Sequence, residues 1–385
     1  MKKICALATA VTLILSAATT LCACKQQTED NLNENFFAMG TLGRLVVDGV
    51  PKDKFEELST EVGDMLTAVE NSLSASRIDS CIYNFNTAAA GATVQIDQTC
   101  YNALSLAKQV YELTGGYFNP AMWYSSDLYG FATRPAGAPA MPYDRQNVTG
   151  KLPDEKYVTA FHTLSEHFSE VEISQSDGRY YATKPSFTVE VDGRAYSLAL
   201  DLGGIAKGMA VDKVNEIFAR HGVEYGYFNF GESSYSVKKF NGGDGNYTVK
   251  ADDPRGEGYY ASFKMQNVNL STSGDNRNYY TVDGTRYCHI IDPTTGSPIR
   301  TGVASVTVVG GQAGLSDALT TALAAMGSEK AVRFINENLT DCKVIMLVFE
   351  DDKDKVITNA PEYFRIEKGN YKLANTVADG KIILN

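Results

Sequence analysis

The stretch from Asp201 to Asp212, DLGGIAKGMAVD, constrains the fold of this chain more than any other segment. It places three glycines, one lysine and a closing carboxylate where a predicted helix begins. Glycines let a backbone approach a ligand closely, and the free amides at the start of a helix attract anions. The stretch is neither a Walker A loop nor a G-x-G-x-x-G fingerprint. Two interpretations therefore stay open: a site for a phosphate-bearing ligand with Lys207 as its positive charge, or a tight strand-to-helix turn.

Helical and strand-like segments follow one another irregularly along the chain. Apolar spacings of three and four residues predict helices, whereas apolar alternation and β-branched runs predict strands. The predicted helices are 55–73, 99–113, 208–220 and 317–326, and the clearest predicted strands are 36–47, 305–309 and 343–349. Asp283-Gly284 predicts a hairpin turn, and the Pro-, Gly- and Ala-rich region 132–152 predicts a loop. Without a regular strand–helix alternation, we expect an α+β fold of mixed, largely antiparallel sheets with packed helices.

The first residues have the pattern of a secretory signal. Lys2 and Lys3 precede an apolar run that closes with Leu21-Cys22-Ala23-Cys24. Leu-x-Ala-Cys resembles the bacterial lipobox, whose cysteine takes up diacylglycerol and becomes the new amino terminus. We therefore expect a lipoprotein signal peptide at 1–23, a polar tether at 24–35 that begins with a lipidated Cys24, and a folded domain at 36–385. The alternative is ordinary signal cleavage, with Cys24 as an incidental thiol.

A lipid anchor at Cys24 would hold the protein on a membrane surface without crossing it, on the outer side of the membrane in a bacterial cell envelope. The formal net charge of the chain is −11, and it falls to −13 once two lysines leave with the signal. Such a charge does not favour nucleic acid as a partner. Four cysteines remain in the folded domain, at a spacing that resembles no zinc site: Cys81, Cys100, Cys288 and Cys342. One or two disulfides and buried free thiols are both compatible with the sequence.

His289 occupies the most distinctive setting among the four histidines. It leaves an apolar strand and enters the turn Asp292-Pro293-Thr294-Thr295-Gly296. A histidine on such a rigid backbone suits a general base or a donor that orients a ligand, although a structural role is the alternative. The other three lie on polar helical stretches, where we expect them to be solvated: His162, His167 and His221.

Asp317 and Thr321 lie one helical turn apart near the start of a predicted helix. Carboxylate and hydroxyl oxygens on one helix face can hold magnesium. The alternative is helix capping by Ser316, with Asp317 interacting favourably with the helix dipole. Ser271-Thr272-Ser273-Gly274 adds hydroxyl groups in a segment that, taken alone, predicts only a loop.

Taken together and in order, these segments resemble the FAD:protein FMN transferases of the ApbE family. The motifs that carry the resemblance are Phe37–Thr41, Leu113–Pro120, Asp201–Asp212, Ser271–Gly274, His289–Gly296 and Ser316–Ala322. The resemblance runs from about Phe36 to Phe349. It implies a single catalytic unit with an α+β architecture related to the T-fold.

By this resemblance, the enzyme would cut the pyrophosphate of FAD and attach FMN, through a phosphoester, to a threonine or serine hydroxyl of an exported redox protein, releasing AMP. Magnesium would be required. Gly204, through its backbone carbonyl, Asp317 and Thr321 match the metal ligands. The catalytic positions are His289, as the base, and Asp317. The positions that match residues contacting FAD are Met39, Tyr117, Phe118, Asn119, Asp201, Lys207, Ser273, His289 and Ile291.

Three residues depart from the family pattern. Ser76 stands where relatives often carry an aromatic residue that stacks on the flavin, Glu232 replaces the second glycine of a Gly-Gly pair, and Asn119 replaces an aspartate. Tyr117, Phe118 or Trp123 could supply the missing aromatic surface. Two other functions are compatible with the same residues: an FAD pyrophosphatase, in which water replaces the protein hydroxyl, and a lipoprotein that binds FAD without turnover.

Overall fold

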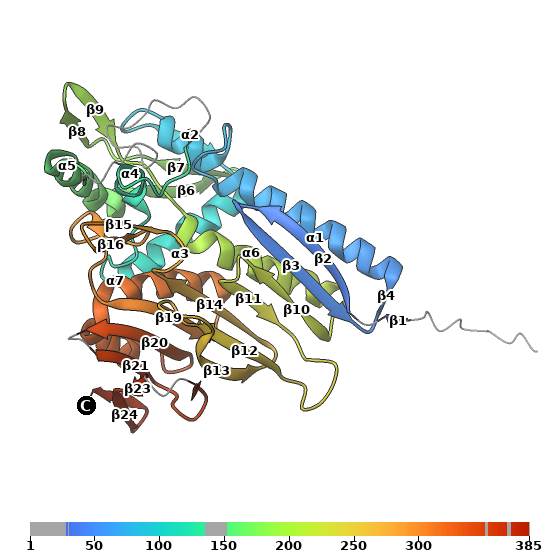
Figure 1. Ribbon diagram of the computed structural model, residues 1–385. Coiled ribbons are helices and arrows are strands. Elements are labelled where there is room, and N and C mark those ends of the chain that lie inside the picture. The colour runs from blue at the N-terminus through green and yellow to red at the C-terminus, as the bar shows by residue number, and fades with distance from the viewer. Residues whose placement is uncertain (1–27, 30, 135–151, 351–352, 368–370, 385) are drawn as a thin grey trace, which may run out of the picture.

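The computed structural model describes residues 28–29, 31–134, 152–350, 353–367 and 371–384. A nine-stranded sheet with the order β2-β3-β10-β11-β14-β19-β20-β21-β23 runs through the molecule (Figure 1). Neighbouring strands are antiparallel except β21 and β23, which are parallel. Its strands are β2 (Leu32–Ala38), β3 (Thr41–Asp48), β10 (Tyr225–Phe230), β11 (Ser234–Val237), β14 (Val268–Gly274), β19 (Val303–Val309), β20 (Lys343–Glu350), β21 (Lys353–Thr358) and β23 (Lys372–Leu373). The predicted α+β fold of mixed, largely antiparallel sheets is confirmed.

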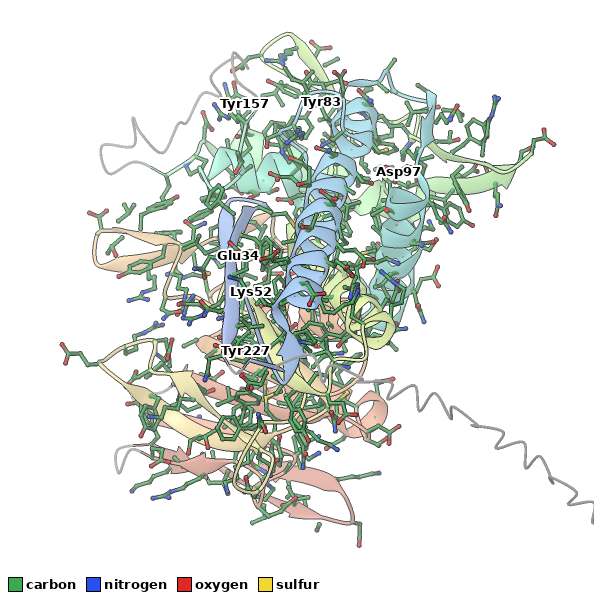
Figure 2. The ribbon with its side chains drawn as sticks, turned by 90° about the vertical axis from the view of Figure 1, so that its right-hand side faces the viewer. Glu34, Lys52, Tyr83, Asp97, Tyr157 and Tyr227 are labelled. Carbon is green, nitrogen blue, oxygen red and sulfur yellow. The ribbon has the colours of Figure 1, made fainter. Side chains whose placement is uncertain are left out.

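Helices gather on one face of this sheet and at one end of it. The α-helices are α1 (Lys52–Leu73), α2 (Cys81–Thr87), α3 (Gln98–Leu113), α4 (Trp123–Leu128), α5 (Glu155–Ser165), α6 (Gly203–Arg220) and α7 (Ala313–Asn338). Helices α6 and α7 contact each other and pack on β11, β14 and β19, while α1 packs on α6 and β2. Figure 2 shows α1 running from Lys52 up to α2, which carries Tyr83. The helices predicted at 55–73, 99–113 and 208–220 are thus present within a few residues of their predicted bounds.

A carboxylate on α6 caps the start of α7. The two oxygens of Asp212 accept hydrogen bonds from the backbone nitrogens of Ala313 and Gly314, each at 2.8 Å. Ser316 does not cap this helix, because its hydroxyl donates to the carbonyl of Gly310. The alternative interpretation, in which Ser316 caps the helix, is therefore wrong. The helix also begins four residues before the predicted Asp317 and continues to Asn338, through a residue with non-helical dihedrals at Gly327.

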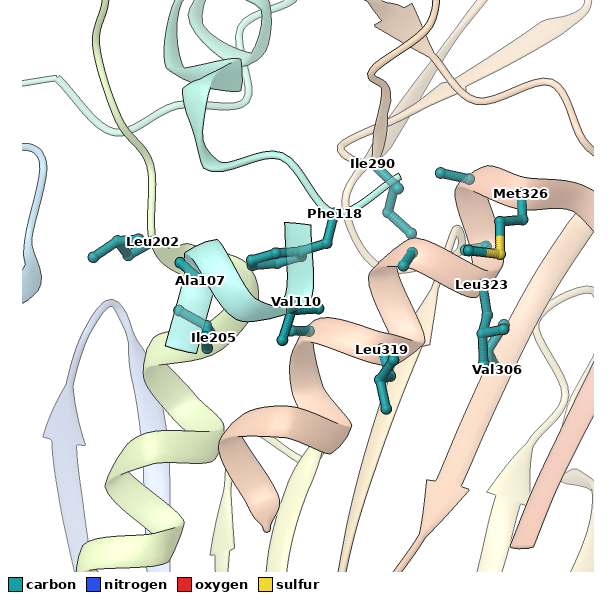
Figure 3. Close-up of a cluster of buried hydrophobic side chains, with 14 of the residues drawn as sticks. Ala107, Val110, Phe118, Leu202, Ile205, Ile290, Val306, Leu319, Leu323 and Met326 are labelled. Atoms are coloured by element: carbon teal, nitrogen blue, oxygen red, sulfur yellow. The ribbon is translucent and has the colours of Figure 1, made fainter. Parts of the chain in front are cut away.

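The apolar core beneath the cleft joins α3, α6, α7 and β19 (Figure 3). Residues of α7 that are three or four positions apart face it, for example Leu319, Leu323 and Met326, which is the spacing of one helix face. The labelled side chains come from α3 and the loop after it, from α6 and the residue before it, from the residue before β17, from β19 and from α7: Ala107, Val110, Phe118, Leu202, Ile205, Ile290, Val306, Leu319, Leu323 and Met326. This core fixes the starts of α6 and α7 relative to each other.

Smaller sheets surround the main one. The sheet β12-β13-β22 packs over the sheet face opposite α7, where a second apolar core lies. The remaining strands are β1 (Thr28–Glu29), β4 (Val50–Pro51), β5 (Thr93–Ile96), β6 (Glu172–Ser176), β7 (Arg179–Thr183), β8 (Thr188–Val191), β9 (Arg194–Ser197), β12 (Tyr247–Asp252), β13 (Tyr259–Met265), β15 (Tyr279–Val282), β16 (Thr285–Cys288), β17 (Ile291–Asp292), β18 (Ser297–Pro298), β22 (Arg365–Ile366), β24 (Asn375–Ala378) and β25 (Lys381–Leu384). The hairpin β15–β16 turns through Asp283 and Gly284, both at positive φ, as predicted.

Several further predictions concern the amino-terminal region, the cysteines and membrane-spanning helices. The signal peptide, Cys24 and most of the loop predicted at 132–152 lie outside the described residues. Strand β2 begins at Leu32, so residues 32–35, which we expected in the tether, belong to the sheet. The four cysteines of the folded part are free thiols, with Cys100 and Cys288 buried. No helix in the described ranges is long and apolar enough to cross a bilayer.

Candidate active site

A cleft of about 600 Å³ opens where α6 and α7 begin, near the end of β14. Most of its walls come from segments far apart in the sequence: 117–122, 201–207, 231–235, 249–254, 272–278 and 289–293, together with two residues of α7. Of the site residues predicted from the sequence, those that line it are Tyr117, Phe118, Asn119, Asp201, Gly204, Lys207, Ser273, His289, Ile291, Asp317 and Thr321.

The start of α6 forms one side of the cleft. Leu202 precedes the helix without a side-chain cap, and Asp201 accepts a hydrogen bond from the nitrogen of Gly203 at 2.8 Å. Burial raises the pKa of the Asp201 carboxyl, against the opposing effects of that hydrogen bond and of Lys207. The Lys207 ammonium donates to the carbonyl of Gly203 at 3.2 Å. The segment thus presents the Lys207 cation to the cleft, whereas the nitrogens of Gly203, Ile205 and Ala206 already donate to Asp201 or Leu202. The part of the phosphate-site prediction that these contacts support is the cation.

Asp317 lies at the base of the cleft with only 3% of its surface exposed. Its Oδ2 atom accepts a hydrogen bond from the backbone nitrogen of Gly208 at 2.9 Å, and the Ser234 hydroxyl also donates to it. Burial raises the pKa of Asp317, while the nearby Lys207 cation and the Gly208 bond lower it. The raised pKa means that the surrounding groups do not fully offset the cost of burying the negative charge, and a bound cation would offset the rest.

The other two predicted metal ligands lie beside each other. A Cβ atom on Gly204 would come within 3.4 Å of Thr321 Oγ1. In a regular helix the nitrogen of Gly208 donates its hydrogen bond to the carbonyl of Gly204. Here that nitrogen also donates to Asp317. The carbonyl oxygen of Gly204 is therefore able to accept a further interaction, such as one with a cation. Thr321 Oγ1 lies 3.4 Å from the hydroxyl of Ser273.

One carboxylate, one hydroxyl and one carbonyl form a donor set that fits magnesium. This ion prefers oxygen, keeps several waters and uses only one or two protein carboxylates when a substrate supplies phosphate oxygens. Within the described ranges, no three His, Cys, Asp or Glu side chains gather as a metal site. The residues present therefore suit a metal that is shared between protein and phosphates, and not one that is enclosed by protein side chains.

His289 follows β16 directly and faces the cleft. Its backbone nitrogen donates to the carbonyl of Asn278 at 3.0 Å, which fixes the residue at the base of the β15–β16 hairpin. His289 keeps an exposed surface in the cleft, yet the protein around it lowers the pKa of its imidazole below 6.5, first by desolvation and then through the Lys207 cation. The ring is therefore neutral at pH 7 and able to accept a proton.

The segment 117–119 contributes both contact area and support. Phe118 is buried, and its ring lies 3.3 Å from the position of a Cβ atom on Gly204. Tyr117 accepts a hydrogen bond from Lys330, whose ammonium also lies over the tyrosine ring. Asn119 uses its side chain structurally: Oδ1 accepts from Ala121 N at 2.9 Å, and Nδ2 donates to the carbonyl of Ser165 at 3.0 Å. An amide can make both contacts, whereas the aspartate of the family pattern could only accept.

Several sequence-based expectations do not coincide with the cleft. Met39 packs beside two apolar cores and does not line the cleft, and neither Ser76 nor Trp123 lines it. Aromatic residues that the sequence did not single out line it instead, namely Phe131, Tyr235 and Phe263. The side chains expected to be solvated are half-buried and partnered: His162 bonds Pro293, His167 bonds Glu170, and His221 bonds Glu61.

The rim of the cleft carries an ion-pair group that no sequence signal indicated. Arg277 lies 2.8 Å from a carboxylate oxygen of Glu232 and 3.3 Å from one of Asp252. Glu232 is the residue that departs from the Gly-Gly pair, and it adopts a positive φ of 52°. The three residues come from separate segments, so only the fold brings them together.

Comparison with known proteins agrees with this site. The model of the ApbE family matches residues 39–346. Relatives named FAD:protein FMN transferase from Klebsiella pneumoniae and Treponema pallidum are each 28% identical, over 316 and 309 residues; the matches cover 82% and 78% of this chain and 83% and 80% of theirs. The solved flavin transferase ApbE from Vibrio cholerae matches with a TM-score of 0.69 and 25% identity, covering 86% of this chain and 97% of its own. The ApbE protein from Thermotoga maritima matches with a TM-score of 0.68 and 24% identity, covering 83% and 94%. Since the family model matches most of its length, this chain belongs to the ApbE family.

Proposed function

We propose that this protein is an FAD:protein FMN transferase. It takes the FMN group of FAD and joins it through a phosphoester to a threonine or serine hydroxyl of a partner redox protein, releasing AMP. One observation carries the proposal: a single cleft holds a neutral histidine, a lysine and a buried carboxylate next to a hydroxyl. These are the groups that phosphoryl transfer to an alcohol needs.

In the reaction, the acceptor hydroxyl oxygen forms a bond to the phosphorus of the FMN half, and the bond from that phosphorus to the oxygen of AMP breaks. His289 accepts the hydroxyl proton, because its lowered pKa keeps the imidazole neutral at pH 7. Lys207 offsets the negative charge on the departing AMP phosphate. The same cation lowers the pKa of His289, so one side chain serves both tasks.

Asp317, Thr321 and the carbonyl of Gly204 are the residues that would hold magnesium. The metal would neutralise charge on the pyrophosphate oxygens while AMP leaves. Support comes from the raised pKa of Asp317 and from the contact between Gly204 and Thr321. The hydrogen bond from Gly208 fixes the carboxylate at the junction of α6 and α7.

We also propose that the protein is a lipoprotein anchored through Cys24 at the outer side of a membrane, where it acts on an exported acceptor. The support is the Leu-x-Ala-Cys sequence at the end of the predicted signal. The earliest described strand, β1, pairs with β4 at the start of α1. Figure 1 shows this end of the molecule far from the β15–β16 hairpin that precedes His289. An anchor preceding β1 would leave the cleft free for an acceptor.

AMP release with and without an acceptor tests the proposed reaction. Residues 25–385 are incubated with FAD and magnesium, either alone or with a redox protein that carries a flavinylation threonine. A transferase releases AMP only when the acceptor is present. Equal AMP release in both reactions would identify an FAD pyrophosphatase, and FAD binding without AMP would identify a binding protein.

A further inference from the structure

Helix α5 contacts two separate segments that line the cleft without lining the cleft itself. At its end, the carbonyl of Ser165 accepts a hydrogen bond from Asn119 Nδ2 at 3.0 Å. One turn earlier, His162 Nε2 lies 2.9 Å from the carbonyl oxygen of Pro293. Since a carbonyl can only accept, Nε2 carries the hydrogen and donates it. Asn119 and Pro293 both line the cleft, so α5 links these two lining segments.

The turn that His162 contacts is rigid in itself. Asp292 Oδ1 accepts from the nitrogen and the hydroxyl of Thr294, at 2.8 and 2.7 Å, and the nitrogen of Gly296 donates to the carbonyl of Asp292 at 2.9 Å. The nitrogen of Ile299 donates to the carbonyl of Ile290 at 2.9 Å, next to His289. A displacement of this turn therefore carries the residues after His289 with it.

Helix α5 and the turn approach each other so closely that only a glycine fits at position 296. Gly296 has a φ of 70°, and a Cβ atom there would lie 2.9 Å from the Cβ of His162. A second contact holds the other end of the turn, where the Tyr129 hydroxyl lies 2.9 Å from that of Ser297. The hydrogen bonds of His162 and Tyr129 thus both fix the turn to the α4–α5 part of the molecule.

We propose that His162 is a positioning residue for FMN transfer. Its Nε2–H group donates a hydrogen bond to the carbonyl of Pro293, and this bond fixes the position of the 289–293 segment relative to Asn119. The expected effect on the transfer rate rests on the proposed function, whereas the expected effect on the structure of the 289–297 segment rests on the contacts alone. A misplacement of about 1 Å in a catalytic group can cost roughly 100-fold in rate. Because His289 keeps its own bond to Asn278, we expect a smaller loss, about tenfold, when the His162 donor is removed.

Three variants of the full folded chain test this. His162→Leu removes the donor, His162→Gln restores an N–H donor on a side chain of similar reach, and His221→Leu makes the same substitution at a histidine that bonds Glu61 on α1 instead. We expect kcat for AMP release with acceptor to fall about tenfold in His162→Leu, to recover most of the loss in His162→Gln, and to be unchanged in His221→Leu. The dissociation constant of FAD should change less than threefold in all three.

Hydrogen exchange of the 289–297 segment gives a readout that needs no turnover. We expect faster exchange in this segment for His162→Leu, and wild-type exchange for His162→Gln. A protein that fails to transfer FMN but shows this pattern refutes the proposed function and keeps the positioning contact. Unchanged exchange, unchanged kcat in His162→Leu, or equal defects in the Leu and Gln variants would each overturn the role of His162.

Discussion

The carboxylate of Asp317 on α7 accepts a hydrogen bond at 2.9 Å from the backbone nitrogen of Gly208 on α6. The two residues are 109 positions apart in the sequence. The bond requires close helix contact, because a Cβ atom on residue 208 would lie 2.2 Å from the carbonyl oxygen of Ala313. The position of the buried carboxylate thus depends on a glycine that is not itself among the predicted site residues.

We therefore expect Gly208→Ala to destabilise the fold. The added methyl group meets backbone atoms, which cannot move aside as a flexible side chain can, so α6 and α7 must separate. Overpacking of this kind lowers the free energy of unfolding by about 1–3 kcal/mol. Urea unfolding measures the loss. Gly204→Ala is the matched control for stability, because its Cβ would lie 3.3 Å from the nearest atom, in the Phe118 ring. Equal stability of the two variants would contradict the close contact.

Asp317→Asn should separate catalysis from stability. The amide oxygen of asparagine can still accept the bond from Gly208, but it carries no charge to hold a metal. We expect FMN transfer to fall about 100-fold or more, the cost typical of losing a group that stabilises developing charge. Without magnesium, the free energy of unfolding should stay equal or rise, since burial raises the pKa of this carboxyl and so makes its charge unfavourable. A variant with wild-type turnover at limiting magnesium would exclude Asp317 as a metal ligand.

The pH dependence of transfer should report the interaction between Lys207 and His289. Desolvation and then Lys207 lower the pKa of His289, so the acid limb of the pH–rate profile lies below pH 6.5. Lys207→Met removes a cation that disfavours the protonated imidazole, and the acid limb should therefore move to higher pH. The position of the limb is read between pH 5 and 8 with saturating acceptor, whatever the absolute rate. A limb at the same pH in both proteins would show that the two side chains do not interact.

A buried lysine away from the cleft predicts a second pH effect. Lys184 is 1% exposed, donates to the carbonyls of Asn86 and Ala88, and has its pKa lowered by burial to about 8. In the unfolded chain the pKa of this lysine returns to 10.5, so the unfolded chain keeps the proton up to higher pH than the folded protein does. Burial of the charged lysine therefore lowers the free energy of unfolding by its full amount below pH 8, and this penalty disappears as the pH rises to 10.5.

Comparison with Lys184→Met isolates this effect, because other titrating groups are common to both proteins. The free energy of unfolding of the wild type minus that of the variant should rise between pH 8 and pH 10.5. Urea unfolding at several pH values measures the difference. A difference that stays constant over this range would mean that the pKa of Lys184 is not lowered.

Local sequence predicted the parts of the site that depend on neighbouring residues. Asp317 and Thr321 share a helix face because they are four residues apart, and the Asp201 to Asp212 stretch forms the start of α6 as its glycines and periodicity indicated. The order of motifs predicted the family, and the irregular mixture of helices and strands predicted the α+β fold. These features need no knowledge of which segments meet.

Contacts between distant segments could not be predicted in the same way. Asp212 caps α7 from 101 residues away, and His162 reaches Pro293 across 131 residues. Each of these side chains looks like a solvated polar residue on its own helix, and only the packing of the helices gives it a partner. Met39 shows the reverse: it matched a motif, yet it packs beside apolar cores outside the cleft lining.

The mass of an acceptor protein after reaction with FAD and magnesium tests the central claim most directly. The account predicts a single FMN-sized increase, located by peptide mapping on one threonine or serine, and lost when that residue is replaced by alanine. The increase should also form about 100-fold more slowly, or more slowly still, when Asp317→Asn replaces the wild-type enzyme. An acceptor that keeps its original mass while FAD is converted to FMN and AMP would contradict the account.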